Sequence, residues 1–356
     1  MKSKLKSAYS YIHENGISEF VMRKILDRAV DSYWKNKIFL SPRNLYVPLN
    51  KIKIDRPIFL LGTQGCGGTV LSRLIRLHPD VVYITGNSRF WGGHAELHDD
   101  ARFKYMPDDW VLRSPGYHNM LWYEKYHPIF GFNRSWVYAT DELLHEYRKT
   151  EKDFSANCEK SIVSVIKKCI RAYSKDLGSS RFHDMSQSYC VKVPLLRKVF
   201  PDVKFIVLLR NPFAMCWREI TRKTGKYKDY AIVPSQTRKL ELACQHWRNT
   251  YTIALNDLGN MANNIIIRYE DFTNNPIDNV NKLLDHCELD KKRYSFPDEK
   301  MKIPLGTKDR WKWWPLIPDV NDKYLDELPE WAREIIENHC GDLIRRFNYE
   351  LDIIAK

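Results

Sequence analysis

The sequence contains no apolar run approaching the roughly 18 to 20 residues that a membrane-spanning helix needs. Its eight cysteines lie far apart, with no CxxC pair and no zinc-type spacing, so reduced thiols are expected rather than disulfides or a structural metal. Residues 1–16 are basic but contain no apolar segment of the kind found in secretory signals. These absences predict a cytoplasmic protein without integral membrane association.

The charge balance is far from neutral, with a net charge of +13 over 356 residues. Such a chain attracts anions, and nucleic acid, acidic lipid and a polyanionic small molecule are all compatible with it. The basic residues are scattered along the sequence instead of gathering into one stretch, which argues against nucleic acid as the partner. A small polyanionic ligand is therefore favoured.

The pattern of apolar residues predicts an α/β protein with one main domain. Residues 1–50 are expected to form a basic helical extension that packs on this domain, with a membrane-surface or partner-docking helix as the alternative. Residues 51–356 alternate strands and helices, which predicts a central parallel sheet flanked by helices. Residues 86–138 are rich in aromatic residues but have little periodicity, and long ordered loops of this kind usually carry function.

The expected elements can be placed by residue range. Apolar residues at 20, 21, 25, 26 and 30 give the extension one helical face. Strands are predicted at 58–61, 81–84, 189–193, 204–209 and 265–267. Helices are predicted over 71–78, 140–177, 235–258, 276–287 and 328–346, with another that begins at Pro212.

The segment 58–75, IFLLGTQGCGGTVLSRLI, places a glycine-rich turn between a strand and a helix. Such a turn directs backbone N–H groups at an anion, although a tight turn without a ligand is the alternative. The nucleotide-triphosphate version of this loop, GxxxxGK[ST], has a lysine where Gly68 stands here. A P-loop kinase or NTPase would also need an acidic metal residue at a second strand end. Neither Arg210-Asn-Pro nor Lys192-Val-Pro supplies one.

Three further segments place charged or aromatic residues directly after predicted strands or in a basic loop. Arg210 follows the strand at 204–209, where ligands bind in parallel sheets, although an arginine paired with a carboxylate is the alternative. Tyr269 follows the strand at 265–267 and could stack on a base, while Glu270 and Asp271 could hold neighbouring loops. The basic loop, GTKDRWKWW at 306–314, suits a nucleotide with an extra phosphate or is simply solvated.

These four segments, in this order and together with CGDLIRRFNYE at 340–350, resemble the sulfotransferases that use 3′-phosphoadenosine-5′-phosphosulfate (PAPS). The resemblance covers about residues 56–350. It implies a single α/β domain of the P-loop nucleotide-kinase type, with PAPS as the donor, 3′-phosphoadenosine-5′-phosphate (PAP) as the product, and no metal. The loop-rich 86–138 segment would then bind the acceptor.

The resemblance also assigns roles to individual residues. The loop would hold the 5′-phosphosulfate, and Arg210 and Arg218 would hold the 3′-phosphate. Lys192 matches a family lysine that sits beside the sulfuryl group and is the leading candidate for stabilising the transition state. The full set of expected cofactor-binding residues is Gly65, Cys66, Gly67, Gly68, Thr69, Val70, Arg210, Arg218, Tyr269, Lys308, Arg310, Trp311 and Lys312.

Three positions depart from the family pattern. The family usually has Lys or Arg where Gly65 stands, a serine where Arg218 stands, and in several branches a catalytic carboxylate near Asn87. Arg89 or Lys308 could supply the missing loop charge. His94 and Glu96 lie in the right region to act as the general base, although each could equally be a surface or structural group.

The resulting expectation is a sulfotransferase that moves the sulfuryl group in line to a hydroxyl or to an amine- or guanidine-type nitrogen. The acceptor is expected to be a soluble small molecule or a sugar-like compound, and a nitrogen acceptor would need no strong base. The alternatives are a catalytically degenerate protein that binds PAPS or PAP, and a P-loop kinase or NTPase. Self-association into a homo-oligomer is left open.

Overall fold

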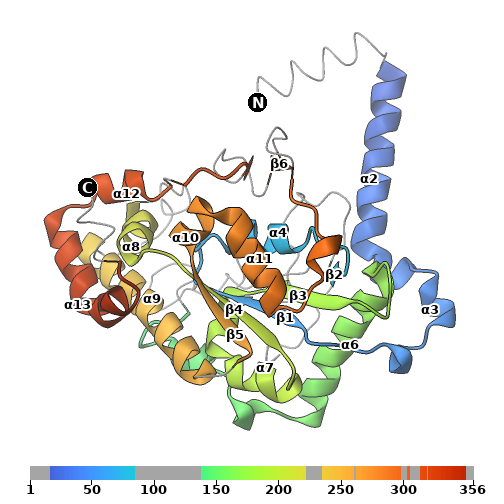
Figure 1. Ribbon diagram of the computed structural model, residues 1–356, viewed down its shortest axis with the longest axis horizontal. Coiled ribbons are helices and arrows are strands. Elements are labelled where there is room, and N and C mark those ends of the chain that lie inside the picture. Colours follow the sequence, from blue (N-terminus) through green and yellow to red (C-terminus); the bar gives the residue numbers. More distant parts are fainter. Residues whose placement is uncertain are drawn as a thin grey trace.

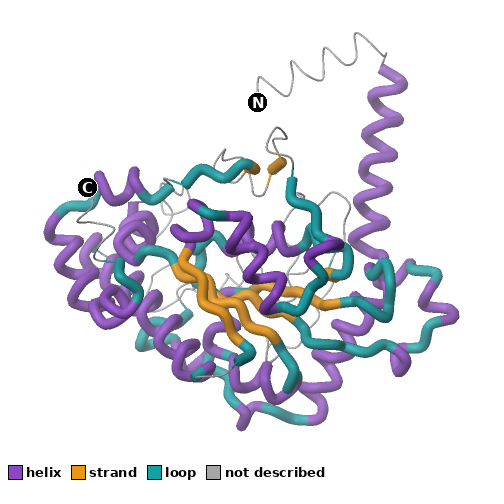
Figure 2. Tube along the Cα trace, viewed as in Figure 1, coloured by secondary structure: helices purple, strands orange, loops and turns teal. Residues whose placement is uncertain are grey.

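A parallel sheet forms the centre of this computed structural model, which describes residues 17–84, 138–221, 235–259, 262–297, 303–304, 313–318 and 320–349. Its strand order is β2-β3-β1-β4-β5, and every neighbouring pair is parallel (Figures 1 and 2). The strands are β1 (Ile58–Leu61), β2 (Val81–Val82), β3 (Arg181–Met185), β4 (Lys204–Leu209) and β5 (Asn264–Arg268). The predicted α/β fold with a central parallel sheet is confirmed.

The two faces of the sheet bury separate apolar cores. Phe59, Phe205 and Val207 point to one core, which α6 (Ala156–Tyr173), α7 (Val193–Val199), α9 (Gln236–Leu258) and α13 (Glu330–Arg346) complete. Ile58, Leu60 and Ile206 point to the other core, which α4 (Gly68–Ile75) and α11 (Pro276–His286) complete. Alternate residues of a strand face opposite sides, and both sides are covered here. The continuous apolar character of 58–61 and 204–209 is explained by this burial.

The helices of the domain largely agree with the predicted ranges. The helices named above and their neighbours are α4 (Gly68–Ile75), α6 (Ala156–Tyr173), α7 (Val193–Val199), α8 (Pro212–Thr221), α9 (Gln236–Leu258), α10 (Tyr269–Asn274), α11 (Pro276–His286) and α13 (Glu330–Arg346). The shorter elements are α3 (Arg43–Tyr46), η1 (Leu49–Lys51), α5 (Leu144–Tyr147), η4 (Glu151–Asp153), η5 (Gln187–Val191), η7 (Lys291–Arg293) and α12 (Asp322–Asp326). Strands β6 (Ile303–Pro304) and β7 (Trp313–Trp314) form an antiparallel pair.

Two predicted elements are wrong. The apolar run at 189–193 is a buried 3-10 turn, η5, that leads into α7, and the sheet strand there is the more polar β3. The single helix predicted over 140–177 is broken into α5, η4 and α6. The breaks occur because the side chains of Thr150 and Ser155 accept hydrogen bonds from the backbone and cap η4 and α6.

The N-terminal helix α2 (Ile17–Leu40) extends away from the domain in Figure 1. Its last turns contact α6, and Ile38 is buried in the core. Val21, Ile25, Leu26 and Val30 are all exposed, so the helix packs on the domain near Ile38 and not through these four residues. Within the described part of the chain, no helix has both the length and the apolar character to cross a membrane.

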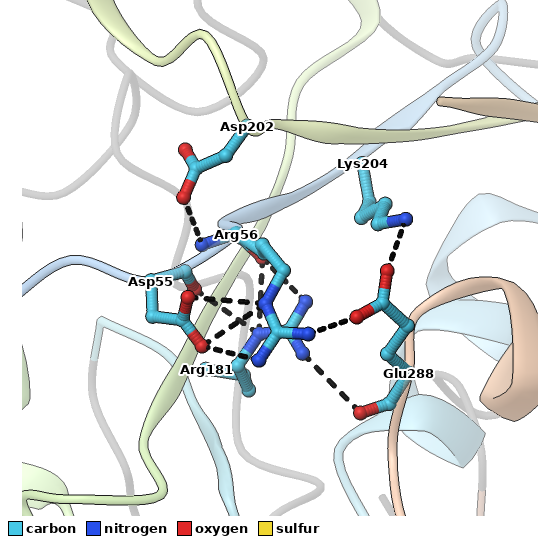
Figure 3. Close-up of polar contacts among 6 residues, drawn as sticks. All are labelled: Asp55, Arg56, Arg181, Asp202, Lys204 and Glu288. Carbon is cyan, nitrogen blue, oxygen red and sulfur yellow. Dashed lines mark hydrogen bonds and ion pairs between the residues drawn. The ribbon is translucent and has the colours of Figure 1, made fainter. Parts of the chain in front are cut away.

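A cluster of charged side chains ties together the starting ends of β1, β3 and β4 (Figure 3). The guanidinium of Arg181 donates to the main-chain oxygens of Asp55 and Arg56, at 2.7 Å in its shortest contact. Arg56 pairs with Glu288, and Lys204 Nζ lies 2.6 Å from the same carboxylate. The hydrogen bond from Lys204 holds the pKa of Glu288 below its usual value. This cluster lies at the sheet edge opposite to the carboxyl ends of the strands.

Candidate functional site

The carboxyl ends of β1, β4 and β5 bring three predicted site segments to one edge of the sheet. Leu61 pairs with Val207, and Leu209 pairs with Arg268, so the three strands end at nearly the same level. The glycine-rich turn, Arg210 and Tyr269 each follow one of these strands directly. Ligands of parallel α/β sheets bind at this edge.

The glycine-rich turn has the backbone conformation of an anion-binding loop. Gly65 and Gly67 have φ angles of +84° and +95°, a left-handed region that glycine enters without strain, and Gly67 caps the start of α4. Gly65, Gly67 and Thr69 are partly accessible, whereas the side chains of Cys66 and Val70 lie in the core below the loop. Only the backbone groups of those two predicted ligands could therefore contact a bound anion.

Met185 packs against the position where a triphosphate-binding loop has its lysine. A Cβ atom at Gly68 would lie 2.7 Å from Met185 Sδ, so a side chain there would require the flexible methionine to shift. Met185 ends β3 and lies in the core beneath the loop. The methionine therefore occupies part of the volume that a side chain at position 68 would need.

Arg210 is a buried cation that braces the loop from the end of β4. Its Nη1 donates to Gly65 O at 2.8 Å, its Nε donates to Asn321 Oδ1 at 2.8 Å, and its Nη2 has no partner within the described residues. Burial lowers the pKa of the guanidinium, and the charge of Arg218 lowers it further. A buried N–H group without an acceptor is costly, which makes Nη2 a natural donor to a bound anion.

Tyr269 holds both the loop and Arg210. The Arg210 guanidinium lies 4.5 Å from the centre of the tyrosine ring, and a Cβ atom at Gly67 would overlap the same ring. The ring is therefore packed between the arginine and the loop, with 4% of the residue exposed. Stacking of Tyr269 on a base stays a prediction.

A polar link behind Arg210 connects it to the two neighbouring chain segments. Asn321 Nδ2 donates to Glu270 Oε1 at 2.6 Å, and Glu270 Oε1 also accepts from the backbone N–H of Asn211 at 2.9 Å. Burial raises the pKa of Glu270. The expected role of Glu270 in holding neighbouring loops is confirmed. Asn321, which sequence reasoning missed, fixes the orientation of Arg210.

Arg218 comes from α8 and reaches the loop at Gly65. A Cβ atom added to Gly65 would overlap the Arg218 guanidinium at Nη1. This nitrogen is buried and has no hydrogen-bond partner within the described residues, and the nearest ion-pair oxygen, Glu219 Oε2, is 3.9 Å away. The buried Arg210 and the partly exposed Arg218 thus converge on one glycine, and each has a buried N–H group without a partner within the described residues.

Lys192 lies between η5 and α7, and its side chain has no exposed surface. It does not follow a strand, as the sequence predicted, because β3 ends at Met185 and η5 intervenes. Its role beside a sulfuryl group stays a prediction.

A cavity of about 20 Å³, enough for one water molecule, lies beside the loop. Its walls include Thr63, Gln64, Met215, Glu219 and His246. His246 Nδ1 accepts from the backbone of Ala139 at 3.3 Å, and burial lowers the pKa of this histidine to about 3. Sequence reasoning gave His246 no role.

The remaining predicted site residues lie outside the described residues: His94, Glu96, Asn87, Arg89, Lys308, Arg310, Trp311 and Lys312. The same holds for nearly all of the expected acceptor segment at 86–138. Within the described part of the chain, no group of three or more His, Cys, Asp or Glu side chains is arranged to hold a metal ion.

Comparisons with known proteins identify the family of the chain. The family model described as "Sulfotransferase family" matches residues 57–293, and the chain belongs to this family. Among solved structures, the chain is similar to a sulfotransferase domain from the curacin biosynthetic pathway, with 14% identity, a TM-score of 0.40, and 80% of this chain and 98% of that chain covered. A Mycobacterium avium sulfotransferase gives 14% identity, a TM-score of 0.40, and coverages of 84% and 83%.

An Alicyclobacillus acidocaldarius sulfotransferase gives 15% identity, a TM-score of 0.39, and coverages of 80% and 96%. No curated protein sequence matches the chain significantly.

Proposed function

We propose that this protein is a sulfotransferase that takes a sulfuryl group from PAPS and passes it to a soluble small-molecule or sugar-like acceptor. The observation that carries the proposal is a pair of arginines at the glycine loop, the buried Arg210 and the partly exposed Arg218, each of which has one buried guanidinium nitrogen without a hydrogen-bond partner within the described residues. Membership of the sulfotransferase family supports the same reaction class. The donor, the acceptor and the catalytic roles below are parts of this proposal.

The site suits a ligand with two separate anionic groups better than a triphosphate. Gly68 provides no lysine that would reach a γ-phosphate. The loop and the start of α4 offer backbone N–H groups to the first anion. Arg210, at the end of the adjacent strand, offers a forked cation of the kind that binds a phosphate through two hydrogen bonds.

The transfer itself breaks the bond between sulfur and the bridging phosphate oxygen and forms a bond from sulfur to the acceptor oxygen or nitrogen. PAP leaves with the electron pair of the broken bond, and the acceptor loses a proton to a base or to water. A loose in-line transition state of this kind depends on positioning and on positive charge around the moving group. Lys192 is assigned to that charge, and His94 or Glu96 to the proton.

Ligand binding and transfer can be measured separately. Isothermal titration calorimetry should show that the protein binds PAP and does not bind ATP in the presence of magnesium. Incubation with sulfur-35-labelled PAPS and a panel of hydroxyl and amine acceptors should then give a labelled product that mass spectrometry identifies. Binding of ATP without PAP would overturn the proposal. Binding of PAP without transfer to any acceptor would identify a binding protein that has lost catalysis.

A further inference from the structure

The contact between Arg218 and Gly65 has an unusual form, because the guanidinium occupies the volume that a side chain at position 65 would need. The overlap with a Cβ atom at Gly65 falls on Nη1, the nitrogen that has no partner within the described residues. Met215, one turn earlier on α8, lies 3.4 Å from the same Cβ position. One face of α8 therefore packs directly against the loop backbone at Gly65.

The Nη1 nitrogen of Arg218 has an ion-pair partner but no hydrogen-bond acceptor within the described residues. Glu219 Oε2 is 3.9 Å from Nη1, beyond hydrogen-bonding distance. The neighbouring group on the loop side is another cation, Arg210, which donates to the carbonyl of Gly65. Two like charges held together at a loop that itself presents N–H groups favour an anion bound between them.

We propose that Arg218 acts on the anionic group held by the loop, the phosphosulfate end of the donor, and that Gly65 is a glycine so that this arginine can reach it. The inference rests on the proposed function. It reassigns Arg218 from the 3′-phosphate, where the sequence placed it, to the reacting end of the molecule. The loop then receives its positive charge from α8 instead of from its own sequence.

The first test separates the two ends of the donor with three ligands. PAP carries both phosphates, AMP only the 5′-phosphate, and 3′-AMP only the 3′-phosphate. Calorimetry on Arg218→Gln should show affinities for PAP and for AMP that fall by the same factor, about 10-fold or more, because both lose the same charge-assisted hydrogen bond. The affinity for 3′-AMP should stay unchanged. Arg218→Lys, which keeps the charge, should recover part of the loss.

The second test uses the steric relation between the two residues. Gly65→Ala should weaken AMP binding strongly in the wild-type background but much less in the Arg218→Gln background, because the displaced arginine is then already absent. Gly67→Ala is the matched control. It also has a left-handed backbone, yet its Cβ meets Tyr269, so its effect should simply add to that of Arg218→Gln.

The outcomes distinguish this inference from the proposed function. A loss confined to PAP and 3′-AMP would return Arg218 to the 3′-phosphate and overturn the inference, while the proposed function would stand. If the affinity for each of the three ligands were the same in Arg218→Gln as in the wild-type protein, the inference would also be overturned. If the wild-type protein bound none of the three, the proposed function and the inference would fail together. Additive effects of Gly65→Ala and Arg218→Gln would remove the steric argument.

Discussion

At the scale of single residues, Asn321 shows how an uncharged side chain can control a charged one. Its amide oxygen accepts from Arg210 Nε, and its amide nitrogen donates to Glu270. These two hydrogen bonds fix the orientation of the Arg210 guanidinium, whose Nη2 has no partner within the described residues. Asn321 is uncharged and acts through Arg210, so its role is positional.

Replacing Asn321 by leucine should therefore weaken ligand binding without touching a ligand-binding group. Two hydrogen bonds to charged partners are lost, and bonds of this kind contribute about 1.5–3 kcal/mol each. We expect Asn321→Leu to raise the dissociation constant of PAP by about 10- to 100-fold, measured by calorimetry. Asn321→Gln, which retains both polar atoms, should recover part of the lost affinity for PAP. A lower melting temperature with an unchanged dissociation constant would mean that Asn321 is only structural.

The sequence predicts some residues of the site and not others. Arg210 and Tyr269 could be predicted because each follows an apolar strand, and parallel strands end at a common edge. Asn321 could not, because 111 residues separate it from Arg210 and no periodic pattern marks it. The position of Arg218 against Gly65 also required three dimensions, since it depends on how α8 packs beside the loop.

At the scale of secondary-structure elements, β3 explains the main error of the sequence analysis. Its sequence, RFHDM, contains three polar residues, yet all five residues are buried. His183 donates to Ile58 O and accepts from Ser72 Oγ at 2.8 Å, and Tyr189 donates to Asp184 at 2.7 Å. A strand whose polar groups are all satisfied internally does not look buried from its sequence. The more apolar run at 189–193 has the composition typical of a buried strand, although it forms η5 and the start of α7.

The start of β3 leads to a prediction about stability. Arg181 is 3% exposed and donates to the main-chain oxygens of Asp55, Arg56 and Glu288. Arg181→Met should lower the free energy of unfolding by about 2–4 kcal/mol, because several buried carbonyls lose a charged donor. Glu288→Gln should lower it by less than about 1 kcal/mol, because the Glu288 carboxylate is half exposed and screened. Urea denaturation would contradict this account if the two variants lost similar stability.

At the scale of the whole molecule, the buried histidines should control stability in mild acid. His183 and His246 are both buried, and burial lowers the pKa of each from 6.5 to about 3. Between these values the unfolded chain binds protons that the folded protein does not. The free energy of unfolding is therefore unaffected by protonation of either histidine above pH 6.5, and it falls as the pH is lowered from 6.5 toward 3.

Unfolding measured at pH 7 and pH 5 should show this directly. Protonation of each histidine in the unfolded chain is expected to lower the free energy of unfolding by about 2 kcal/mol between pH 7 and pH 5. His183→Asn should be less stable than wild type at pH 7 but should lose about 2 kcal/mol less on going to pH 5. The carboxylates with lowered pKa values, such as Asp55 and Glu288, titrate below this interval and do not contribute. An unchanged pH slope in His183→Asn would contradict the prediction.

The proposed ligand site and the charged cluster lie at opposite ends of the strands, and this separation has a practical consequence for engineering. The proposed anion site lies at the carboxyl ends of the strands, whereas the charged cluster of Figure 3 lies at their starting ends. Distant sites contribute independently to stability. Stability added at the starting ends of the strands should thus increase tolerance to later substitutions around the loop. A library of loop variants would then best begin from a parent that keeps Arg181 and its main-chain hydrogen bonds.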